Sequence, residues 1–261
     1  MQMRKCFPIF IAALSLCGSG VASGETLTIA GSTTVDAFLM APHRREIEAS
    51  SGQQIVLTPN RTDLGIKQLY DGRADLAMAS TDLDSTRKML RRRYPELDLQ
   101  RLQSTVVCQT RTAFTIHPDN PVQSASNEQI TQILLGKITN WRDLGGADEH
   151  IKVVVVRQGG GAELSVAARL LSGMAISAPS TIRVQIASQV NRVVEQERGA
   201  LGLAQVENMR GRQVKEISTN AKIEQELSLM WLDEPTAAMQ AVIMATNKIA
   251  PKVIPTCKDE S

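Results

Sequence analysis

Short apolar runs alternate with amphipathic stretches along the part of the chain that follows residue 24. The runs 27–30, 54–58 and 74–79 have the length and composition of buried β-strands. Between the first two runs, apolar residues recur at helical spacing and predict a helix over 35–50, and a shorter helix is predicted over 62–70. Strands that alternate with helices in this way predict an α/β fold with a largely parallel sheet.

The pattern changes near the middle of the chain. Residues 106–116 form one long β-type run, and Ser126 with Gln129 has the spacing of a capping box for a helix over 128–135. The continuous apolar run 151–156 is typical of a strand that is buried on both faces. Further strands are predicted over 200–204 and 227–232, and further helices over 163–171, 186–197 and 235–248, the last with Pro235 at its first position.

The first 24 residues have the pattern of a secretory signal peptide. Two basic residues precede an apolar run over 6–16, and small residues at 21–23 form a cleavage signature. We therefore expect export to the periplasm, with a mature chain that starts near Gly24. The alternatives are a retained membrane anchor, for which the apolar run is short, and a lipoprotein anchored at Cys17.

The charge balance of the remaining chain excludes several classes of partner. The whole sequence has a formal net charge of +2, and residues 1–24 contain two basic and no acidic residues, so the mature chain has no basic excess. A nucleic-acid backbone or an anionic membrane therefore has no general attraction to it. Aromatic residues make up 3% of the chain, which argues against a site that stacks sugars or single-stranded nucleic acid. The basic cluster within 87–93 is predicted to be a solvated helix face.

Cysteine and histidine usage limits the chemistry further. Cys108 and Cys257 lie outside the predicted leader, and the sequence leaves open whether they form a disulfide. His43, His117 and His150 do not stand in a spacing typical of a nucleophilic or metal site. We therefore predict no catalytic residues, no metal site and no cofactor.

Three segments share one arrangement, in which a strand ends, a polar or glycine-rich turn follows and a helix begins. They are 31–34, 61–63 and 157–161, and Thr62 with Asp63 would form an N-cap pair in the second. A helix start presents unpaired N–H groups and the positive end of the helix dipole, and glycine lets the backbone approach a ligand. If the three segments converge, they would bind a small anion without net positive charge. Ordinary helix capping is the structural alternative.

Four segments together resemble the phosphate-binding periplasmic component of ABC transporters. They are 31–35, 72–80, 135–146 and 154–157, and they span nearly the whole mature chain in the expected order. The most specific of them contains the run Gly-Lys-Ile-Thr-Asn-Trp at 136–141.

The resemblance implies the type II solute-binding-protein fold, an α/β fold of two lobes with mixed, mostly parallel sheets and an interlobe cleft. The first lobe would consist of residues 25–108 and 216–261, and the second of residues 109–215, with 106–116 as one crossing strand. The implied function is capture of phosphate or a similar oxyanion by a monomer. Closure of the lobes would be recognised by a membrane transporter permease or a sensor.

The resemblance also implies ligand residues, though the family pattern is not complete. The implied set is Ser32, Thr33, Thr34, Thr62, Ser80, Arg157, Gly160, Gly161 and Glu163. Arg157 matches the family's essential arginine. Where the family has a Gly-Ser-Gly-Thr run, residues 160–163 are Gly-Gly-Ala-Glu, so two hydroxyls are missing. The family's aspartate after the third strand would match Asp82 only with a shift of one residue.

Glu163 is the sharpest departure from the family pattern. Two negative groups about 4 Å apart repel by about 4 kcal/mol at an effective dielectric constant of about 20, so a fully ionised oxyanion would bind poorly beside this side chain. A protonated phosphate could instead donate its proton to Glu163. The alternative is a first-turn residue that points to solvent. The missing hydroxyls also leave open a divergent paralogue with another ligand or an interaction role at the cell envelope.

Overall fold

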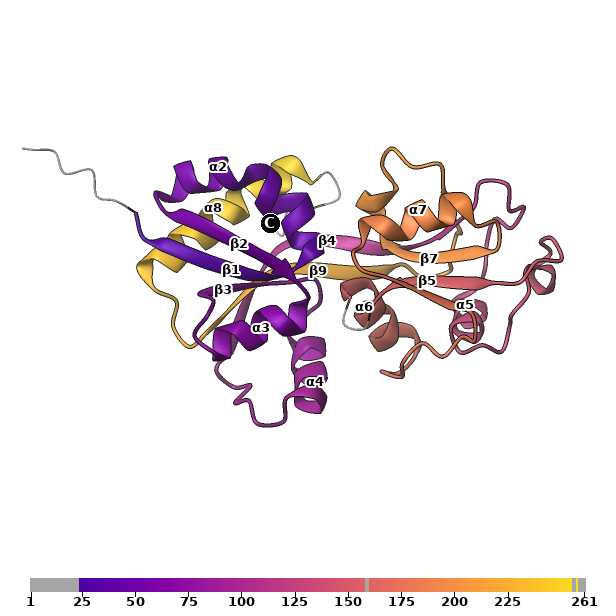
Figure 1. The fold of residues 1–261 in the computed structure, drawn as a ribbon, viewed down its shortest axis with the longest axis horizontal. Helices are drawn as coiled ribbons and strands as arrows, with labels where there is room; N and C mark the ends of the chain where they lie inside the picture. The colour runs from indigo at the N-terminus through magenta and orange to yellow at the C-terminus, as the bar shows by residue number, and fades with distance from the viewer. Residues whose placement is uncertain (1–23, 158–159, 255–256, 258–261) are drawn as a thin grey trace, which may run out of the picture.

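The computed structural model describes residues 24–157, 160–254 and 257 (Figure 1). The predicted leader, including Cys17, therefore lies outside the described residues except for Gly24. In the part of the chain that is described, no helix has the length and apolar character needed to cross a bilayer.

The first lobe is built on three parallel strands that the apolar runs predict. Strand β1 lies between β2 and β3, and helices cover both faces of this sheet (Figure 1). The predicted helix after β1 is a continuous helical segment with a π-helical stretch, η1, and it ends at Gly52 in the left-handed conformation. The elements are β1 (Thr26–Ser32), α1 (Thr33–Val35), η1 (Asp36–Met40), α2 (Ala41–Ser51), β2 (Gln54–Asn60), α3 (Thr62–Tyr70), β3 (Leu76–Ala79), α4 (Leu83–Arg93) and α8 (Ala237–Val253).

Two long antiparallel strands join the first lobe to the second. Strand β4 (Leu102–Ile116) pairs with β9 (Ile223–Leu232) over most of its length, with an irregularity between Val106 and Cys108. In Figure 1 both strands run from one lobe into the other. The crossing strand predicted over 106–116 is therefore part of β4.

The second lobe contains three further parallel strands. Strand β5 lies between β7 and β6. Its middle residues are fully buried, as predicted for the apolar run that forms it. The capping box of Ser126 and Gln129 is present at the start of α5. The elements are α5 (Asn127–Leu134), η2 (Trp141–Leu144), β5 (Lys152–Val156), α6 (Gly161–Leu170), β6 (Thr181–Val184), α7 (Ser188–Gln196), β7 (Ala200–Gln205), η3 (Val206–Met209) and β8 (Lys215–Glu216).

All strands of the described residues join one mixed sheet. Its order is β2-β1-β3-β9-β4-β7-β5-β6, with β8 paired to the end of β4. The pairs are parallel inside each lobe and antiparallel along β4 and β9. Each lobe buries separate apolar clusters: α2 and α8 cover one face of the first lobe and α3 and α4 the other, while α5 and α6 lie opposite α7 in the second. This is the predicted two-lobed α/β fold.

The caps of α3 and α8 differ from the prediction. The N-cap of α3 is Arg61, one residue before the predicted pair, and it makes no side-chain capping bond. The N-cap of α8 is Thr236, whose hydroxyl accepts from the Met239 amide at 3.2 Å, so Pro235 precedes the cap instead of occupying the first helical turn. At α3 the Asp63 carboxylate binds two arginines and therefore does not cap the helix. At α8 the Thr236 side chain is a good cap, so the helix begins after it.

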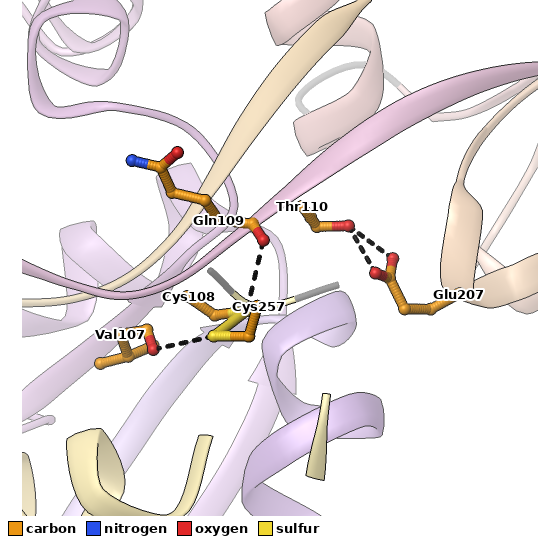
Figure 2. Close-up of a disulfide and its surroundings, with 6 residues drawn as sticks. All are labelled: Val107, Cys108, Gln109, Thr110, Glu207 and Cys257. Atoms are coloured by element: carbon orange, nitrogen blue, oxygen red, sulfur yellow. Dashed lines mark hydrogen bonds between the residues drawn. A yellow bond between two sulfur atoms is a disulfide. The ribbon is translucent and has the colours of Figure 1, made fainter. Parts of the chain in front are cut away.

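Cys108 and Cys257 form a disulfide, which answers the question that the sequence left open (Figure 2). Their Cα atoms are 5.0 Å apart, and the two residues are separated by 149 positions. Cys108 lies on β4 directly after the irregularity, and the Cys257 Sγ atom lies 3.6 Å from the carbonyl oxygen of Val107. The bridge therefore ties the chain beyond α8 to the point where β4 crosses between the lobes.

Candidate functional site

A cavity lies between the lobes, where the carboxyl ends of several strands meet. Its volume is about 370 Å³, including the part that opens to solvent. Ligands commonly bind outside the carboxyl ends of strands in α/β sheets, because helix starts gather there. The lining residues are Ser32, Thr33, Thr34, Asn60, Arg61, Thr62, Ser80, Val156, Gly160, Gly161, Ala162, Gln185, Ala187 and Gln205.

The hydroxyl groups on the first-lobe side are packed together. The Ser32 Oγ atom donates to the Ser80 Oγ atom at 2.9 Å and accepts from the Thr34 amide at 3.2 Å. Ser32 therefore caps the helical segment and lines the cavity at once. Gly31 before it has φ +123°, and a Cβ atom there would lie 2.3 Å from the Met78 carbonyl oxygen, so the turn requires glycine.

The start of α3 contributes a buried hydroxyl and an arginine. Thr62 is buried, and its Oγ1 atom accepts from the Ser80 amide at 3.3 Å. Arg61 binds Asp63 through two hydrogen bonds of 3.0 Å, and Arg93 binds the same carboxylate at 3.0 Å. The Asp63 side chain is completely buried. The hydrogen bond to Asp63 raises the pKa of Arg61 above its ordinary value.

The start of α6 brings the second lobe into direct contact with the first. A Cβ atom on Gly161 would lie 2.0 Å from the Ser80 Oγ atom and 2.4 Å from the Ser80 carbonyl oxygen. That carbonyl accepts a hydrogen bond of 2.6 Å from Gln225, a buried residue of β9. Glycine is thus required at 161 by the close approach of two lobes, and not by its φ angle.

Arg157 and Glu163 are not among the residues that line the cavity within the described part of the chain. Arg157 is exposed, and its Nη1 atom donates to the Gln185 Oε1 atom at 2.9 Å. Gln185 itself lines the cavity, so Arg157 reaches the cavity border through that amide.

Glu163 does not point to solvent, which corrects the alternative interpretation of its position. Glu163 is 7% exposed, and its Oε1 atom accepts from the Arg183 guanidinium at 3.2 Å. Its Oε2 atom is buried without a hydrogen-bond partner among the described residues. Burial raises the pKa of Glu163, and the Arg183 guanidinium opposes that shift.

Asp82 has a structural role at the start of α4. Its Oδ1 atom accepts from the Ser85 amide at 2.8 Å, so this carboxylate is the N-cap of the helix. It is not part of the cavity lining among the described residues.

The structure brings most of the predicted ligand residues together and adds others. The predicted residues in the lining are Ser32, Thr33, Thr34, Thr62, Ser80, Gly160 and Gly161. Sequence reasoning did not select the polar lining residues Asn60, Arg61, Gln185 and Gln205. Asn60 and Gln205 are the last residues of β2 and β7. A polar side chain at the carboxyl end of an apolar strand is therefore the sequence pattern that could have identified them as lining residues. The described residues contain no cluster of three or more His, Cys, Asp or Glu side chains that could hold a metal ion.

Comparisons with known proteins agree with this fold. A sequence profile of the PBP superfamily domain matches residues 19–259. The phosphate-binding protein PstS of Bacillus subtilis (strain 168) is 24% identical over 185 residues, which is 71% of this chain. The resemblance carried by the four sequence segments is therefore confirmed.

Two solved structures have the same two-lobed fold. An ABC-type phosphate transport receptor from Vibrio cholerae superposes with a TM-score of 0.68 at 22% identity, covering 88% of this chain and 97% of that one. A putative phosphate ABC transporter substrate-binding protein with bound phosphate from Clostridium perfringens gives a TM-score of 0.70 at 20% identity, covering 84% and 92%. The aligned region spans 58% of the Bacillus subtilis protein's own length, so less than two thirds of that relative is matched.

Proposed function

The chain belongs to the PBP superfamily, and from that premise we propose that it is an exported binding protein for inorganic phosphate or a similar oxyanion. Its relatives include proteins that are named as a phosphate-binding protein and a phosphate transport receptor. In this proposal the protein binds its ligand without chemical conversion and passes it to a membrane transporter or a sensor.

The composition of the cavity lining carries the proposal. Hydroxyl groups of the first lobe, amide side chains of the second lobe and helix starts from both lobes meet there, and the described lining residues include one arginine and no acidic side chain. Hydroxyl and amide donors that are fixed in place bind an oxyanion without requiring net positive charge on the protein. A cationic solute, or a neutral solute without acceptor oxygens, would leave these donors unpaired, which is costly for buried groups.

A protonated phosphate also needs hydrogen-bond acceptors. Asn60 lines the cavity, and its Oδ1 atom is buried without a hydrogen-bond partner among the described residues. Glu163 remains the proposed carboxylate acceptor: it lies outside the described lining, but it stands two positions after the lining residue Gly161 in α6, and its buried Oε2 atom has no hydrogen-bond partner among the described residues. Sulfate carries no proton at neutral pH, so preference for phosphate over sulfate is the expected signature of such acceptors.

The remaining parts of the proposal concern the whole protein. Residues 25–108 with 216–261 and residues 109–215 act as two lobes that close on the ligand, and the closed form is what the membrane partner recognises. The protein acts as a monomer in the periplasm after removal of residues 1–24, and it does not bind nucleic acid.

Calorimetry of the mature protein against a panel of anions tests this function. We expect phosphate to bind more tightly than sulfate, and a hundredfold excess of phosphate over its dissociation constant to stabilise the fold by about 2.7 kcal/mol. Met244→Ala, a change at an exposed side chain of α8, is the control and should bind like the unmodified protein. Absence of phosphate binding would contradict the proposal, and tight binding of a different solute would identify a divergent paralogue.

A further inference from the structure

Arg61 has a special place among the residues of the cavity. Of the described residues in the lining, it is the one with a charged side chain. It is the N-cap of α3, so its backbone is already at the point where the helix presents unpaired N–H groups. Its side chain is 26% exposed, which leaves part of the guanidinium accessible.

Asp63 fixes the orientation of this guanidinium. The Arg61 Nε atom donates to the Asp63 Oδ1 atom at 3.0 Å, and the Nη2 atom donates to the Oδ2 atom at 3.0 Å. This bidentate arrangement uses one edge of the planar group and restricts its rotation. The Nη1 atom has no protein partner among the described residues, so its N–H groups are available to a ligand.

Arg93 keeps the cluster positive. A buried carboxylate beside the cavity would by itself repel an anion. The Arg93 Nη1 atom lies 3.0 Å from the Asp63 Oδ2 atom, so two guanidinium groups share one carboxylate. The cluster of Arg61, Asp63 and Arg93 therefore carries one unit of positive charge in excess. The Arg93 side chain is the more exposed of the two, and Arg61, unlike Arg93, is a residue of the described cavity lining.

We infer that Arg61 is the principal cationic contact of a tetrahedral oxyanion in the cavity. Asp63 orients the Arg61 guanidinium, and Arg93 offsets the negative charge of Asp63. Arg157, the residue that the family pattern favours, is exposed and outside the described lining, with its Nη1 atom bound to Gln185. Asp63 and Arg93 are positioning residues, because they act on the anion through Arg61. This inference rests on the proposed function and names the residue that carries its electrostatics.

Phosphate titrations of arginine variants test the assignment. Arg61→Ala should weaken phosphate binding at least thirtyfold, and Arg61→Lys should recover part of that loss, because a point charge replaces a fixed planar donor. The matched control Arg210→Ala removes an exposed arginine of the second lobe outside the cavity lining and should change the dissociation constant by less than threefold. Arg157→Ala should weaken phosphate binding less than Arg61→Ala does. Urea unfolding of each variant shows that it is folded before the titration.

Two further readouts separate a ligand contact from a structural role. The affinity of the unmodified protein should fall with added potassium chloride more steeply than that of Arg61→Ala, since the variant lacks the charge that salt screens. Added methylguanidine should partly restore phosphate binding to Arg61→Ala. Arg93→Ala should weaken binding by several fold while Arg61 remains in place, because Asp63 then cancels the charge of Arg61.

The outcomes distinguish the inference from the function on which it rests. If the unmodified protein does not bind phosphate, the proposed function fails and the inference fails with it. If the unmodified protein binds phosphate and folded Arg61→Ala binds within threefold of it, the inference alone is overturned. A larger loss for Arg157→Ala than for Arg61→Ala would also overturn it and return the principal charge to Arg157.

Discussion

Glu163 combines an ion pair with a buried oxygen that lacks a hydrogen bond, and this makes its protonation a measurable property. Desolvation raises the pKa of the Glu163 carboxyl above its ordinary value of 4.5 despite the Arg183 guanidinium. A carboxyl whose pKa is raised on folding contributes stability that is present below its unfolded pKa and is lost as the pH rises through the folded pKa. The expected effect of Glu163→Gln is therefore a free energy of unfolding that declines less than that of the unmodified protein between pH 4.5 and pH 7.

Urea unfolding at both pH values measures this difference. Glu234→Gln, a change at an exposed carboxylate, is the matched control and should leave the pH dependence as it is in the unmodified protein. Parallel pH profiles for the Glu163→Gln variant and the unmodified protein would show that burial does not raise the pKa of Glu163.

At this scale the sequence predicts some site residues well and others poorly. Ser32, Thr62 and Ser80 lie directly at strand ends, so their place in the cavity follows from local order along the chain. The choice between Arg61 and Arg157 does not follow from local order. It depends on where each flexible side chain finds a partner. Arg93, which shares Asp63 with Arg61, lies thirty positions after Asp63 in another helix.

The disulfide links two parts of the chain that are far apart in sequence, so its removal should lower the stability of the whole fold. A bridge across 149 positions restricts the unfolded chain strongly, and disulfides typically contribute about 2–4 kcal/mol. We expect Cys108→Ala with Cys257→Ala to lower the free energy of unfolding by about this amount. Denaturant unfolding with and without reductant is the measurement.

Reductant itself provides the control for this prediction. It should destabilise the unmodified protein to the level of the double variant and have no effect on the double variant. An unfolding midpoint that stays constant after full reduction, verified by thiol counting, would contradict a stabilising role for the bridge.

Strand β9 supports the cavity through Gln225, although this residue is not in the lining. Its Nε2 atom donates to the Ser80 carbonyl at 2.6 Å, and its Oε1 atom accepts from the Thr112 hydroxyl of β4 at 3.3 Å. Gln225→Met keeps the length of the side chain but leaves these buried groups unpaired, which costs about 1–3 kcal/mol. We expect weaker phosphate binding as well, because Ser80 loses its support.

Thr112→Val is the matched variant for Gln225→Met. It removes the weaker of the two hydrogen bonds and leaves the bond to Ser80, so it should affect phosphate affinity less. Urea unfolding and phosphate calorimetry of both variants measure the two effects. Equal losses of affinity would contradict a specific role for the contact with Ser80.

Most elements were predictable, whereas some of their boundaries were not. Apolar runs gave the parallel strands β1, β2, β3, β5 and β7, and the spacing of Ser126 and Gln129 gave the capping box of α5, because these signals are local. The parallel strand β6 was not predicted, because its four residues Thr-Ile-Arg-Val do not form an apolar run. Helix α3 begins at Thr62 as predicted, but its N-cap is Arg61 and not the predicted pair of Thr62 and Asp63, since Asp63 is held by two arginines and does not cap the helix. A competing tertiary contact of this kind has no local signature.

At the scale of the whole molecule, one sheet continues through both lobes by way of β4 and β9 (Figure 1). Alternating strands and helices predict an α/β fold, but they do not give this strand order, because β3 pairs with β9 across about 150 positions of the chain. The resemblance to a two-lobed family supplied the crossing strands. Contacts between the lobes then hold them together. Gly161 lies against Ser80 in the cavity, and outside the cavity lining the Arg92 Nη1 atom donates to the Gly173 carbonyl at 3.2 Å.

Gly161→Ala tests whether this close approach of the lobes is needed for binding. The new Cβ atom would lie 2.0 Å from the Ser80 Oγ atom and 2.4 Å from the Ser80 carbonyl oxygen, so the lobes must separate locally to accommodate it. Each lobe keeps its own apolar core, and alanine favours a helix more than glycine does by about 1 kcal/mol. We therefore expect phosphate affinity to fall at least tenfold in calorimetry while the free energy of unfolding changes little.

Gly211→Ala provides the opposite case, a glycine substitution that strains the backbone away from the cavity. Gly211 has φ +66° and open space around its Cβ position, so alanine there strains the backbone by about 1–2 kcal/mol without touching the cavity. It should lower stability and leave phosphate affinity unchanged, whereas Gly161→Ala should do the reverse. If both substitutions reduce affinity in proportion to lost stability, the contact between Gly161 and Ser80 contributes to folding alone, and binding does not depend on how closely the lobes approach each other.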